Sequence, residues 1–152
     1  MMNVAQKIQA LLPYKKPFLF VDEIKSVDEN GITGSYTYRE DEFFYEGHFP
    51  DRPITPGVIM IETMAQIGLV AYGMFLMKVY ESLQPLEFVF SNSKVDFNKP
   101  VYPGQKVIVK ATKKFFRMGK LKVQAELLDE TGDCVCRGEL SGIILNERWR
   151  KE

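Results

Sequence analysis

The stretch that decides the fold runs from Gly47 to Tyr72 and reads GHFPDRPITPGVIMIETMAQIGLVAY. It joins a proline-rich loop, which carries the only histidine of the chain, His48, to a nearly uncharged segment. Within the twenty residues 58–77, Glu62 is the only side chain expected to carry a charge near neutral pH. Burying an ionised carboxylate costs several kcal/mol unless it is paired or becomes neutral. The rest of the chain therefore has to account for this one acid.

The segment that contains Glu62 is predicted to form one long helix over residues 57–79, opened by Pro56-Gly57. Because Gly57 has no side chain, a ligand can approach its backbone closely. The first N–H groups of a helix have no partner within it and lie at the positive end of its dipole. We therefore expect this helix start to suit a carbonyl oxygen that gains negative charge during a reaction.

The same segment is long and hydrophobic enough to cross a membrane. However, Glu62 and Gln66 lie inside it, Gly68 and Gly73 interrupt it, and the residues after it read as strands of a soluble domain. A helix that is hydrophobic on all sides can also form the buried axis of a domain. We favour the buried helix over the membrane span.

Outside this stretch, hydrophobic spacing and turn residues predict a short helix, a hairpin and a second group of strands. Residues 3–12 repeat apolar side chains at helical spacing up to a proline. Residues 18–27 and 32–39 are predicted to pair as a β-hairpin, and residues 40–56 to form an ordered loop. The strands after the long helix are predicted over residues 86–97, 105–116, 121–130 and 133–145.

This order of elements predicts an α+β domain in which an antiparallel sheet curves around the long helix. Only such a wrap would hide every face of a hydrophobic helix from water. One small sheet rarely covers a helix of this kind by itself, so we also expect a dimer.

Length and composition are those of a single domain over residues 1–152. The 20 Lys and Arg balance the 20 Asp and Glu, which gives no bias towards nucleic acid or a membrane surface. The N-terminus lacks a signal-peptide pattern, so a cytoplasmic location is expected. Cys134 and Cys136 lie two apart in a predicted strand, where disulfides are rare, and one histidine makes a poor metal site. We therefore expect reduced thiols, no metal and no cofactor.

His48 and Glu62 are the one acid–base pair in unusual surroundings. Histidine can act as a base near neutral pH, and a carboxyl in an apolar helix has its pKa raised, which favours a protonated acid. A base and an acid beside a backbone oxyanion site would suit proton abstraction next to a carbonyl. On the residues alone, a hydrogen-bonding loop histidine and a glutamate paired with a buried arginine account for the pattern equally well.

Residues 47–66 match the pattern G-H-F-P-x-x-P-x-x-P-G-V, then E-x-M-A-Q, without a gap. This pattern resembles the signature of the β-hydroxyacyl-acyl carrier protein dehydratases of the FabZ type. The resemblance extends upstream to Leu12-Pro13 and residues 17–22, and downstream to residues 97–104 and the closing strands. It therefore covers nearly the whole chain.

The resemblance implies a hot-dog fold, with the active site at the interface of a homodimer that can assemble into a trimer of dimers. The substrate would be a 3-hydroxyacyl thioester on acyl carrier protein. His48 of one subunit would take its α-proton, and Glu62 of the other would protonate the departing β-hydroxyl, giving water and a trans-2-enoyl thioester. The N–H of Gly57 would hold the thioester oxygen. A Glu in place of Asp at the acid position favours dehydration without double-bond isomerisation.

Further substrate contacts are implied for Val58 and for Gln66, which lies one helical turn from Glu62. Gln66 would orient Glu62 or satisfy a buried polar group. Three apolar side chains would line the acyl tunnel or belong to the core, namely Phe18, Phe49 and Met64. Basic side chains on strands are candidate contacts for the acidic carrier protein: Lys94, Lys113, Lys114 and Arg117.

The chain departs from the family pattern around the tunnel. Residues 12–18 read LPYKKPF where typical members have LPHRYPF, and FSNSKVDF at 90–97 replaces a Gly-Ile-Asp-like segment. These positions bear on the acyl chain, so fatty acid, polyketide and aryl-polyene pathways stay open. The alternatives to a dehydratase are a hot-dog acyl thioesterase and a non-catalytic, acyl-binding subunit of a heteromeric dehydratase.

Overall fold

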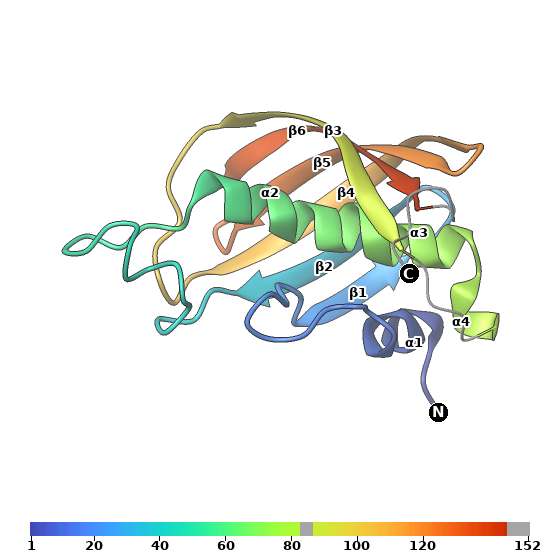
Figure 1. The fold of residues 1–152 in the computed structure, drawn as a ribbon, viewed down its shortest axis with the longest axis horizontal. Coiled ribbons are helices and arrows are strands. Elements are labelled where there is room, and N and C mark those ends of the chain that lie inside the picture. The colour runs from blue at the N-terminus through green and yellow to red at the C-terminus, as the bar shows by residue number, and fades with distance from the viewer. Residues whose placement is uncertain (83–86, 146–152) are drawn as a thin grey trace.

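The computed structural model describes residues 1–82 and 87–145 of the chain. Within these residues six strands form one sheet in the order β1-β2-β4-β5-β6-β3, with antiparallel neighbours throughout. The sheet curves around a long helix (Figure 1), which confirms the expected α+β architecture. The elements are α1 (Val4–Ala10), β1 (Glu23–Val27), β2 (Gly31–Thr37), α2 (Gly57–Ala65), the π-helical η1 (Gln66–Ala71), α3 (Tyr72–Leu76), α4 (Val79–Ser82), β3 (Phe88–Phe97), β4 (Lys106–Arg117), β5 (Lys120–Asp129) and β6 (Cys134–Ile144).

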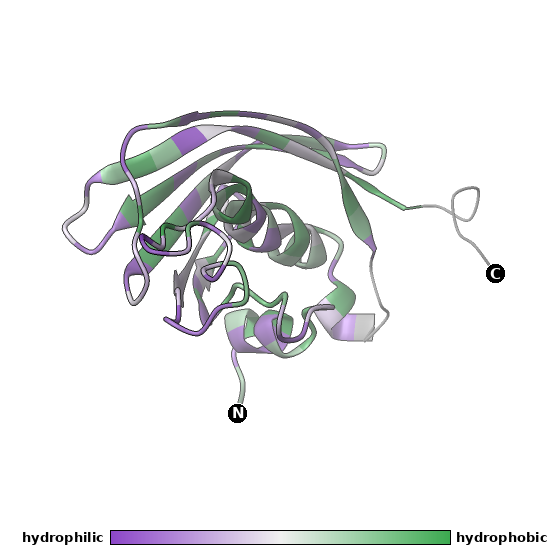
Figure 2. Ribbon diagram, turned by 60° about the vertical axis from the view of Figure 1, so that its left-hand side comes forward, coloured by the Kyte–Doolittle hydropathy of each residue, from purple (hydrophilic) through white to green (hydrophobic). Residues whose placement is uncertain are grey.

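The long helix, Gly57–Leu76, lies under the arch of the sheet (Figure 2). Gly68 lets it approach the sheet closely, because a Cβ at this position would lie 3.0 Å from the Cβ of Ala111 on β4 and 3.7 Å from Cγ2 of Val123 on β5. In its most hydrophobic 18-residue window, 78% of the residues are buried within the fold. Packing against the sheet therefore accounts for the hydrophobicity that also suits a membrane span.

The helix ends earlier than the predicted boundary at residue 79, and it is not α-helical throughout. Lys78 adopts a φ of 56°, in the left-handed region where an α-helix cannot continue. A separate short helix, α4, follows from Val79. The middle turn of the long helix, η1, is π-helical and wholly buried, which the hydrophobic spacing did not predict.

The predicted strands are confirmed with one exception. The four strands after the helix begin and end within a residue or two of the predicted positions, and only residue 86 lies outside the described residues. The hairpin is also confirmed, but its first strand begins at Glu23, so the prediction of a strand from residue 18 is wrong. Between Phe18 and Phe20 the backbone bonds to the side chain of Gln66 on the helix, and not to a neighbouring strand. The hydrophobic pattern of this segment reflects its contact with the helix.

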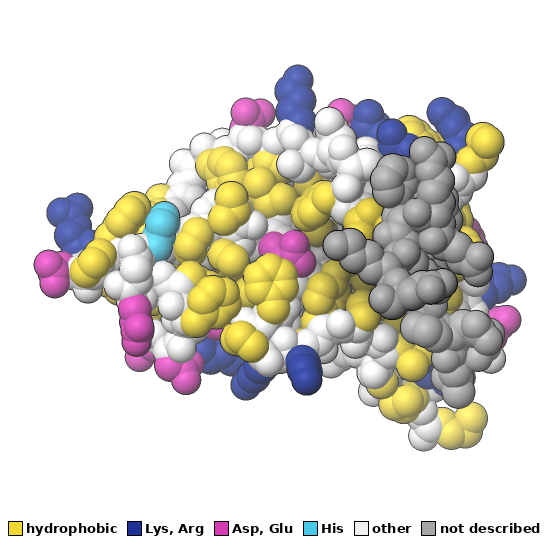
Figure 3. All heavy atoms as spheres, in the orientation of Figure 1, with side chains coloured by type: hydrophobic (Ala, Val, Ile, Leu, Met, Phe, Trp, Pro, Cys, Tyr) yellow, Lys and Arg dark blue, Asp and Glu magenta, His cyan; other side chains and the backbone are white. Residues whose placement is uncertain are grey.

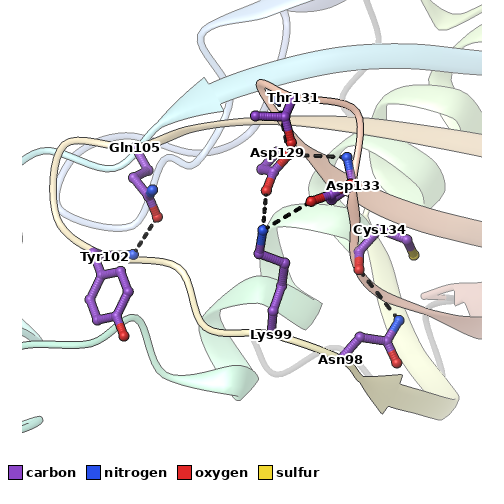
Figure 4. Close-up of polar contacts among 8 residues, drawn as sticks. All are labelled: Asn98, Lys99, Tyr102, Gln105, Asp129, Thr131, Asp133 and Cys134. Atoms are coloured by element: carbon purple, nitrogen blue, oxygen red, sulfur yellow. Dashed lines mark hydrogen bonds and ion pairs between the residues drawn. The ribbon is translucent and has the colours of Figure 1, made fainter.

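The loop between β3 and β4 is tied to the β5–β6 turn (Figure 4). The Nζ of Lys99 lies 2.7 Å from a carboxylate oxygen of Asp129 and 3.3 Å from one of Asp133. The same loop accepts a hydrogen bond from the N–H of Thr55 at the carbonyl of Val101, 2.8 Å away. The turn, the loop and the segment just before the long helix thereby support one another.

The two edge strands of the sheet differ in cover. At β1, the side chain of Gln9 on α1 donates to the carbonyl of Asp22 and accepts from the N–H of Ile24. At the other edge, β3 pairs with β6 alone among the described strands. Its residues are exposed except for the partly buried Phe88 and Val95. Among the described elements, the uncovered edge strand is therefore β3.

Both cysteines are free thiols, as expected from their spacing. Cys136 is buried, and burial raises the pKa of its thiol to about 12. The thiol is therefore protonated and inert near neutral pH. Among the described residues, no three His, Cys, Asp or Glu side chains gather as metal ligands would.

Candidate active site

His48 is held in one orientation by the loop that carries it. Its Nδ1 lies 2.9 Å from the carbonyl oxygen of Ile54, and its own carbonyl accepts a hydrogen bond of 2.9 Å from the N–H of Ile54. A carbonyl oxygen can only accept, so Nδ1 carries the proton and donates it in this bond. In the neutral ring, Nε2 is then left with a lone pair. This is the tautomer that a general base needs at Nε2.

The loop around His48 is itself tied to its surroundings. The ring of His48 stacks on that of Phe49, with centroids 4.1 Å apart and planes inclined by 24°. Next to Ile54, the hydroxyl of Thr55 lies 2.6 Å from that of Tyr45, and both residues are buried. The histidine therefore stands on an ordered loop although its ring is only half-buried.

Glu62 lies in the second turn of α2 and is partly buried. Burial raises the pKa of its carboxyl, and a hydrogen bond of 3.0 Å from Nε2 of Gln66 to Oε2 opposes part of that rise. The carboxyl consequently stays protonated to a higher pH than usual, and a protonated carboxyl can act as an acid.

Gln66 does more than contact Glu62, because its amide also satisfies the backbone of the 18–20 segment. Nε2 donates to the carbonyl of Phe18 at 2.9 Å, and Oε1 accepts from the N–H of Phe20 at 2.8 Å. The side chain is fully buried, so these bonds have no competition from water. Both roles expected for Gln66 are thus present: it contacts the acid and satisfies buried polar groups.

Glu62 opens into a cavity of about 200 Å³. The walls come from the segment after α1, from the long helix and from β3. The lining residues are Tyr14, Glu62, Ala65, Leu69, Val70, Phe88, Val89 and Phe90. Apart from Tyr14 and Glu62 the side chains are hydrophobic, so the cavity suits an apolar group next to an acid.

The start of α2 offers free backbone donors close to this acid. None of the described residues accepts a hydrogen bond from the N–H of Gly57 or of Val58. The side chain of Val58 is exposed. A Cβ at Gly57 would lie 3.1 Å from the ring of Phe97 on β3, so a larger residue would press against this ring. The absent side chain of Gly57 therefore lets the ring of Phe97 pack close to the helix start.

Glu62 lines its cavity without His48, and loop residues next to His48 line a different hollow. Beside the histidine, a more open hollow of about 610 Å³ is lined by Phe49, Arg52, Pro53, Ile54 and Tyr102. None of these residues lines the cavity of Glu62, and Glu62 is absent from this hollow. The two reactive side chains therefore do not share a cavity within one chain.

The remaining predicted tunnel residues are scattered. Phe18 is 43% exposed, with its ring edge-on to Phe20 at 5.0 Å. Phe49 is 53% exposed beside His48, whereas Met64 is fully buried in the core. None of the three lines the cavity of Glu62.

Sequence reasoning did not identify most residues of this cavity. Ala65 and Leu69 follow Glu62 at helical spacing, and that signal could have placed them on the same face. Tyr14 and Phe90 lie in the two segments that depart from the family pattern, which was a signal for them. That these segments meet Glu62 depends on contacts between distant parts of the chain, which no local pattern reveals.

The basic candidates for the carrier protein lie on the sheet in different settings. Lys114 forms an ion pair of 2.6 Å with Glu139, and Lys113 lies 3.9 Å from Glu29. The guanidinium of Arg117 stacks over Phe115. Exposed ion pairs of this kind contribute little to stability.

Hydrophobic side chains gather over the face that α2 presents, with an acidic group in their midst (Figure 3). This face adjoins the uncovered strand β3. The loop before α2, α2 itself, β3 and the loop after β3 carry exposed hydrophobic side chains, namely Phe49, Val58, Val89, Phe90, Phe97 and Tyr102. A hydrophobic patch of this kind marks a surface that contacts another molecule.

The model of the FabA-like domain family matches residues 12–136 of the chain. The chain is 41% identical over 108 residues to the 3-hydroxyacyl-acyl-carrier-protein dehydratase FabZ of Acinetobacter baylyi, covering 70% of this chain and 71% of that protein. It is 37% identical over 137 residues to the FabZ of Caldicellulosiruptor bescii, covering 88% and 93%.

Solved structures show the same fold. The dehydratase heterocomplex ApeI:P from Xenorhabdus doucetiae superposes with a TM-score of 0.78 at 16% identity, over 93% of this chain and 92% of that chain. The PaaI protein from the phenylacetic acid degradation operon of E. coli superposes with a TM-score of 0.61 at 16% identity, over 92% of each chain. These likenesses confirm the hot-dog fold.

Proposed function

This chain belongs to the FabZ-type dehydratases of the FabA-like family, and we propose that it removes water from a 3-hydroxyacyl thioester carried by acyl carrier protein. One observation carries the proposal: in a chain whose FabA-like domain spans residues 12–136, Glu62 is a carboxyl of raised pKa at the wall of a hydrophobic cavity. The product would be the trans-2-enoyl thioester. The enzyme is accordingly a hydro-lyase, and neither step below needs a cofactor.

In the proposed reaction, Nε2 of His48 takes the proton from the carbon next to the thioester carbonyl. The electron pair of that C–H bond forms the new double bond, and the bond from C3 to its oxygen breaks. Glu62 donates its proton to this oxygen, which leaves as water. The reaction therefore requires Glu62 to be protonated and Nε2 of His48 to be unprotonated. The raised pKa of Glu62 and the hydrogen bond at Nδ1 of His48 favour these two states.

The thioester oxygen gains negative charge as the α-proton leaves. We place it at the N–H groups of Gly57 and Val58, which have no partner among the described residues. Donors already oriented towards a developing oxyanion need no reorganisation during the reaction. The helix dipole adds to their effect at this end of α2.

The complete active site would form between two copies of the chain. Within the described part of the subunit, His48 does not line the Glu62 cavity, and the exposed strand β3 lies next to both the hydrophobic face and that cavity. Two such edges can pair and bury these side chains together. We propose a homodimer in which His48 of one subunit faces Glu62 of its partner; association into a trimer of dimers is a further expectation.

The direct test measures water loss from a short series of 3-hydroxyacyl thioesters on acyl carrier protein, by mass and by ultraviolet absorbance of the enoyl product. We expect turnover by the isolated protein. His48→Ala and Glu62→Gln should each lower kcat/KM by about 10²–10⁴, the usual contribution of a general base or acid. Glu46→Gln is the matched control, because Glu46 is exposed on the same loop as His48 and should not affect turnover.

Three outcomes would contradict the proposal. Release of free thiol without enoyl product would indicate a thioesterase. Activity only after addition of a second dehydratase-like chain would indicate a non-catalytic subunit. Normal turnover in either His48→Ala or Glu62→Gln would overturn the assigned roles. Contact with the carrier protein through Lys94, Lys113, Lys114 or Arg117, and a cytoplasmic location, remain predictions.

A further inference from the structure

Tyr14 is a cavity residue to which the proposed reaction steps assign no role. It lies in the segment between α1 and β1 and lines the same cavity as Glu62. No hydrogen bond joins its hydroxyl to any residue in the described part of the chain. Its ring is partly buried against the core and forms part of the cavity wall, where it can contact a group that enters the cavity.

The ring of Tyr14 lies close to the acid. Burial has the larger effect in raising the pKa of the Tyr14 hydroxyl, and the charge of Glu62 raises it further. These two residues supply the only polar side chains of the lining, whereas the six others are hydrophobic. Tyr14 thus stands beside the point where the reacting carbons would lie.

The cavity continues from the acid along the helix. Ala65, Leu69 and Val70 line it at the third, seventh and eighth positions after Glu62. At 1.5 Å of rise per residue this row extends for about 12 Å. Its volume of about 200 Å³ is small. Pockets for drug-sized ligands usually measure roughly 300–1,000 Å³.

We propose that Tyr14 contacts the acyl chain just beyond Glu62 and restricts this protein to short-chain 3-hydroxyacyl thioesters. The inference rests on the proposed function, because it takes C3 of the substrate to lie at Glu62 and the rest of the chain to enter the cavity. A longer chain would have to displace the Tyr14 ring, which is packed against the core. Tyr14 is therefore a specificity-determining residue, and removing its ring enlarges the cavity.

The experiment compares 3-hydroxybutanoyl, 3-hydroxyhexanoyl and 3-hydroxydecanoyl thioesters on the wild-type protein and on Tyr14→Ala. In the wild type, kcat/KM should fall from hexanoyl to decanoyl. Tyr14→Ala should raise the decanoyl-to-butanoyl ratio by about tenfold or more, the scale on which a hydrophobic pocket discriminates chain length. Tyr14→Phe keeps the ring and should keep the wild-type ratio.

Phe43→Ala is the matched control, because it removes a ring that is 53% exposed and outside this cavity. Its ratio should equal that of the wild type. Equal turnover of all three chain lengths by the wild type would overturn the inference, and so would an unchanged ratio in folded Tyr14→Ala. If Tyr14→Ala does not fold, Tyr14→Leu replaces it, because leucine is shorter than tyrosine and still fills part of the site with an apolar side chain. The decanoyl-to-butanoyl ratio of kcat/KM should then rise in Tyr14→Leu, and an unchanged ratio would overturn the inference.

A binding measurement separates this inference from the proposed reaction. Acyl-pantetheine amides of the same three lengths cannot react, so calorimetric affinities report the cavity alone. If the wild type binds the short amide most tightly and Tyr14→Ala loses this preference, the role of Tyr14 is supported. This holds even if no thioester loses water, because the absence of dehydration overturns only the dehydratase proposal. Dehydration by the wild type with no shift in ratio or affinity overturns only the role of Tyr14.

Discussion

Glu62 is tolerated in a hydrophobic helix because its side chain lies at the wall of a cavity and not in the packed core. Two effects act on the pKa of its carboxyl in opposite directions. Burial raises its pKa, while Gln66 stabilises the charged form by donating a hydrogen bond. Since burial has the larger effect, the protonated form persists to higher pH, and a general acid needs that form.

The raised pKa of Glu62 predicts a pH-dependent effect of Glu62→Gln on stability. Below the ordinary carboxyl pKa of 4.5, the residue is neutral in both the folded and unfolded states, so the two proteins should unfold alike. As the pH rises through the folded pKa, the wild type loses stability because its folded state holds the proton more tightly than the unfolded state does. Glu62→Gln should therefore gain in melting temperature relative to the wild type between weakly acidic and neutral pH.

Thermal unfolding of the two proteins across this pH range checks the sign. A melting-temperature difference that is constant with pH would contradict the raised pKa. The pH dependence of the wild-type rate is a second test, because turnover should fall on the alkaline side as Glu62 ionises.

The buried amide of Gln66 predicts a large cost for Gln66→Leu. The substitution would leave the carbonyl of Phe18 and the N–H of Phe20 without their partner. Each buried group left unsatisfied costs about 1–3 kcal/mol. We expect the free energy of unfolding in denaturant to fall, and kcat/KM to fall with it because Glu62 loses its donor.

Gln9→Leu is the matched control for this prediction. Gln9 also bonds a carbonyl and an N–H two residues apart, those of Asp22 and Ile24, but it lies outside the cavity. It should lower stability and leave kcat/KM unchanged. Equal losses of turnover in both variants would show that Gln66 has no particular effect on Glu62.

Among single residues, His48 and Glu62 could be singled out from the sequence because both are rare in their local surroundings. The tautomer of His48 could not, since it depends on the carbonyl of Ile54 turning back towards the ring. Tyr14 stood out only as a departure from the family pattern at residues 12–18, and its contact with the Glu62 cavity could not be predicted. An aromatic residue in a short connecting segment is common, and only its position against Glu62 makes it informative.

At the scale of elements, β3 links the cavity to the uncovered edge of the sheet. Its first residues form one cavity wall, and its outer edge is free of any described strand. Gly138 on β6 lets it lie this close. A Cβ at Gly138 would collide with the carbonyl oxygen of Lys94 and lie 2.7 Å from the Cα of Val95.

Gly138→Ala should therefore displace β3, because its backbone cannot rotate away as a side chain can. Overpacking of this kind costs typically about 1–3 kcal/mol. Denaturant unfolding would measure this loss, and the shifted cavity wall should also lower kcat/KM. In Gly47→Ala the added methyl group has nothing within 4 Å, so its stability should remain close to that of the wild type. Equal stability of the two variants would contradict the tight β3–β6 contact.

The elements that local patterns predicted well are those whose exposure alternates along the chain. Strands β4 and β5 alternate buried and exposed residues along much of their length, so their spacing reveals them. Residues 18–22 were wrongly predicted as part of a strand, and the π-helical turn η1 was not predicted. The first is hydrophobic because it meets the helix, and the second is buried on every side, so neither has a periodic signal that identifies its backbone.

At the scale of the whole molecule, a shared active site predicts complementation between two inactive variants. Mixing His48→Ala with Glu62→Gln, after unfolding and refolding them together, should restore activity. A mixed dimer would combine the intact His48 of one chain with the intact Glu62 of the other. With random pairing, half of the dimers are mixed and carry one working site of two, so we expect about a quarter of the wild-type activity.

Each variant refolded alone is the control and should stay inactive. A mixture that also stays inactive, although light scattering shows dimers, would place the His48–Glu62 pair within one chain. A protein that remains monomeric at all concentrations would contradict the shared site itself.

The sequence by itself determined the order of elements, the buried character of the long helix, the two reactive side chains and the family. These follow from local spacing and from a motif confined to residues 47–66, and both can be read without knowledge of distant contacts. Only the tertiary structure decided that Gln66 holds the 18–20 segment, that Tyr14 meets Glu62 in a small cavity and that β3 lies uncovered. The physical reason is that these features arise where the sheet closes over the helix, and the packing of distant segments leaves no periodic trace in the chain.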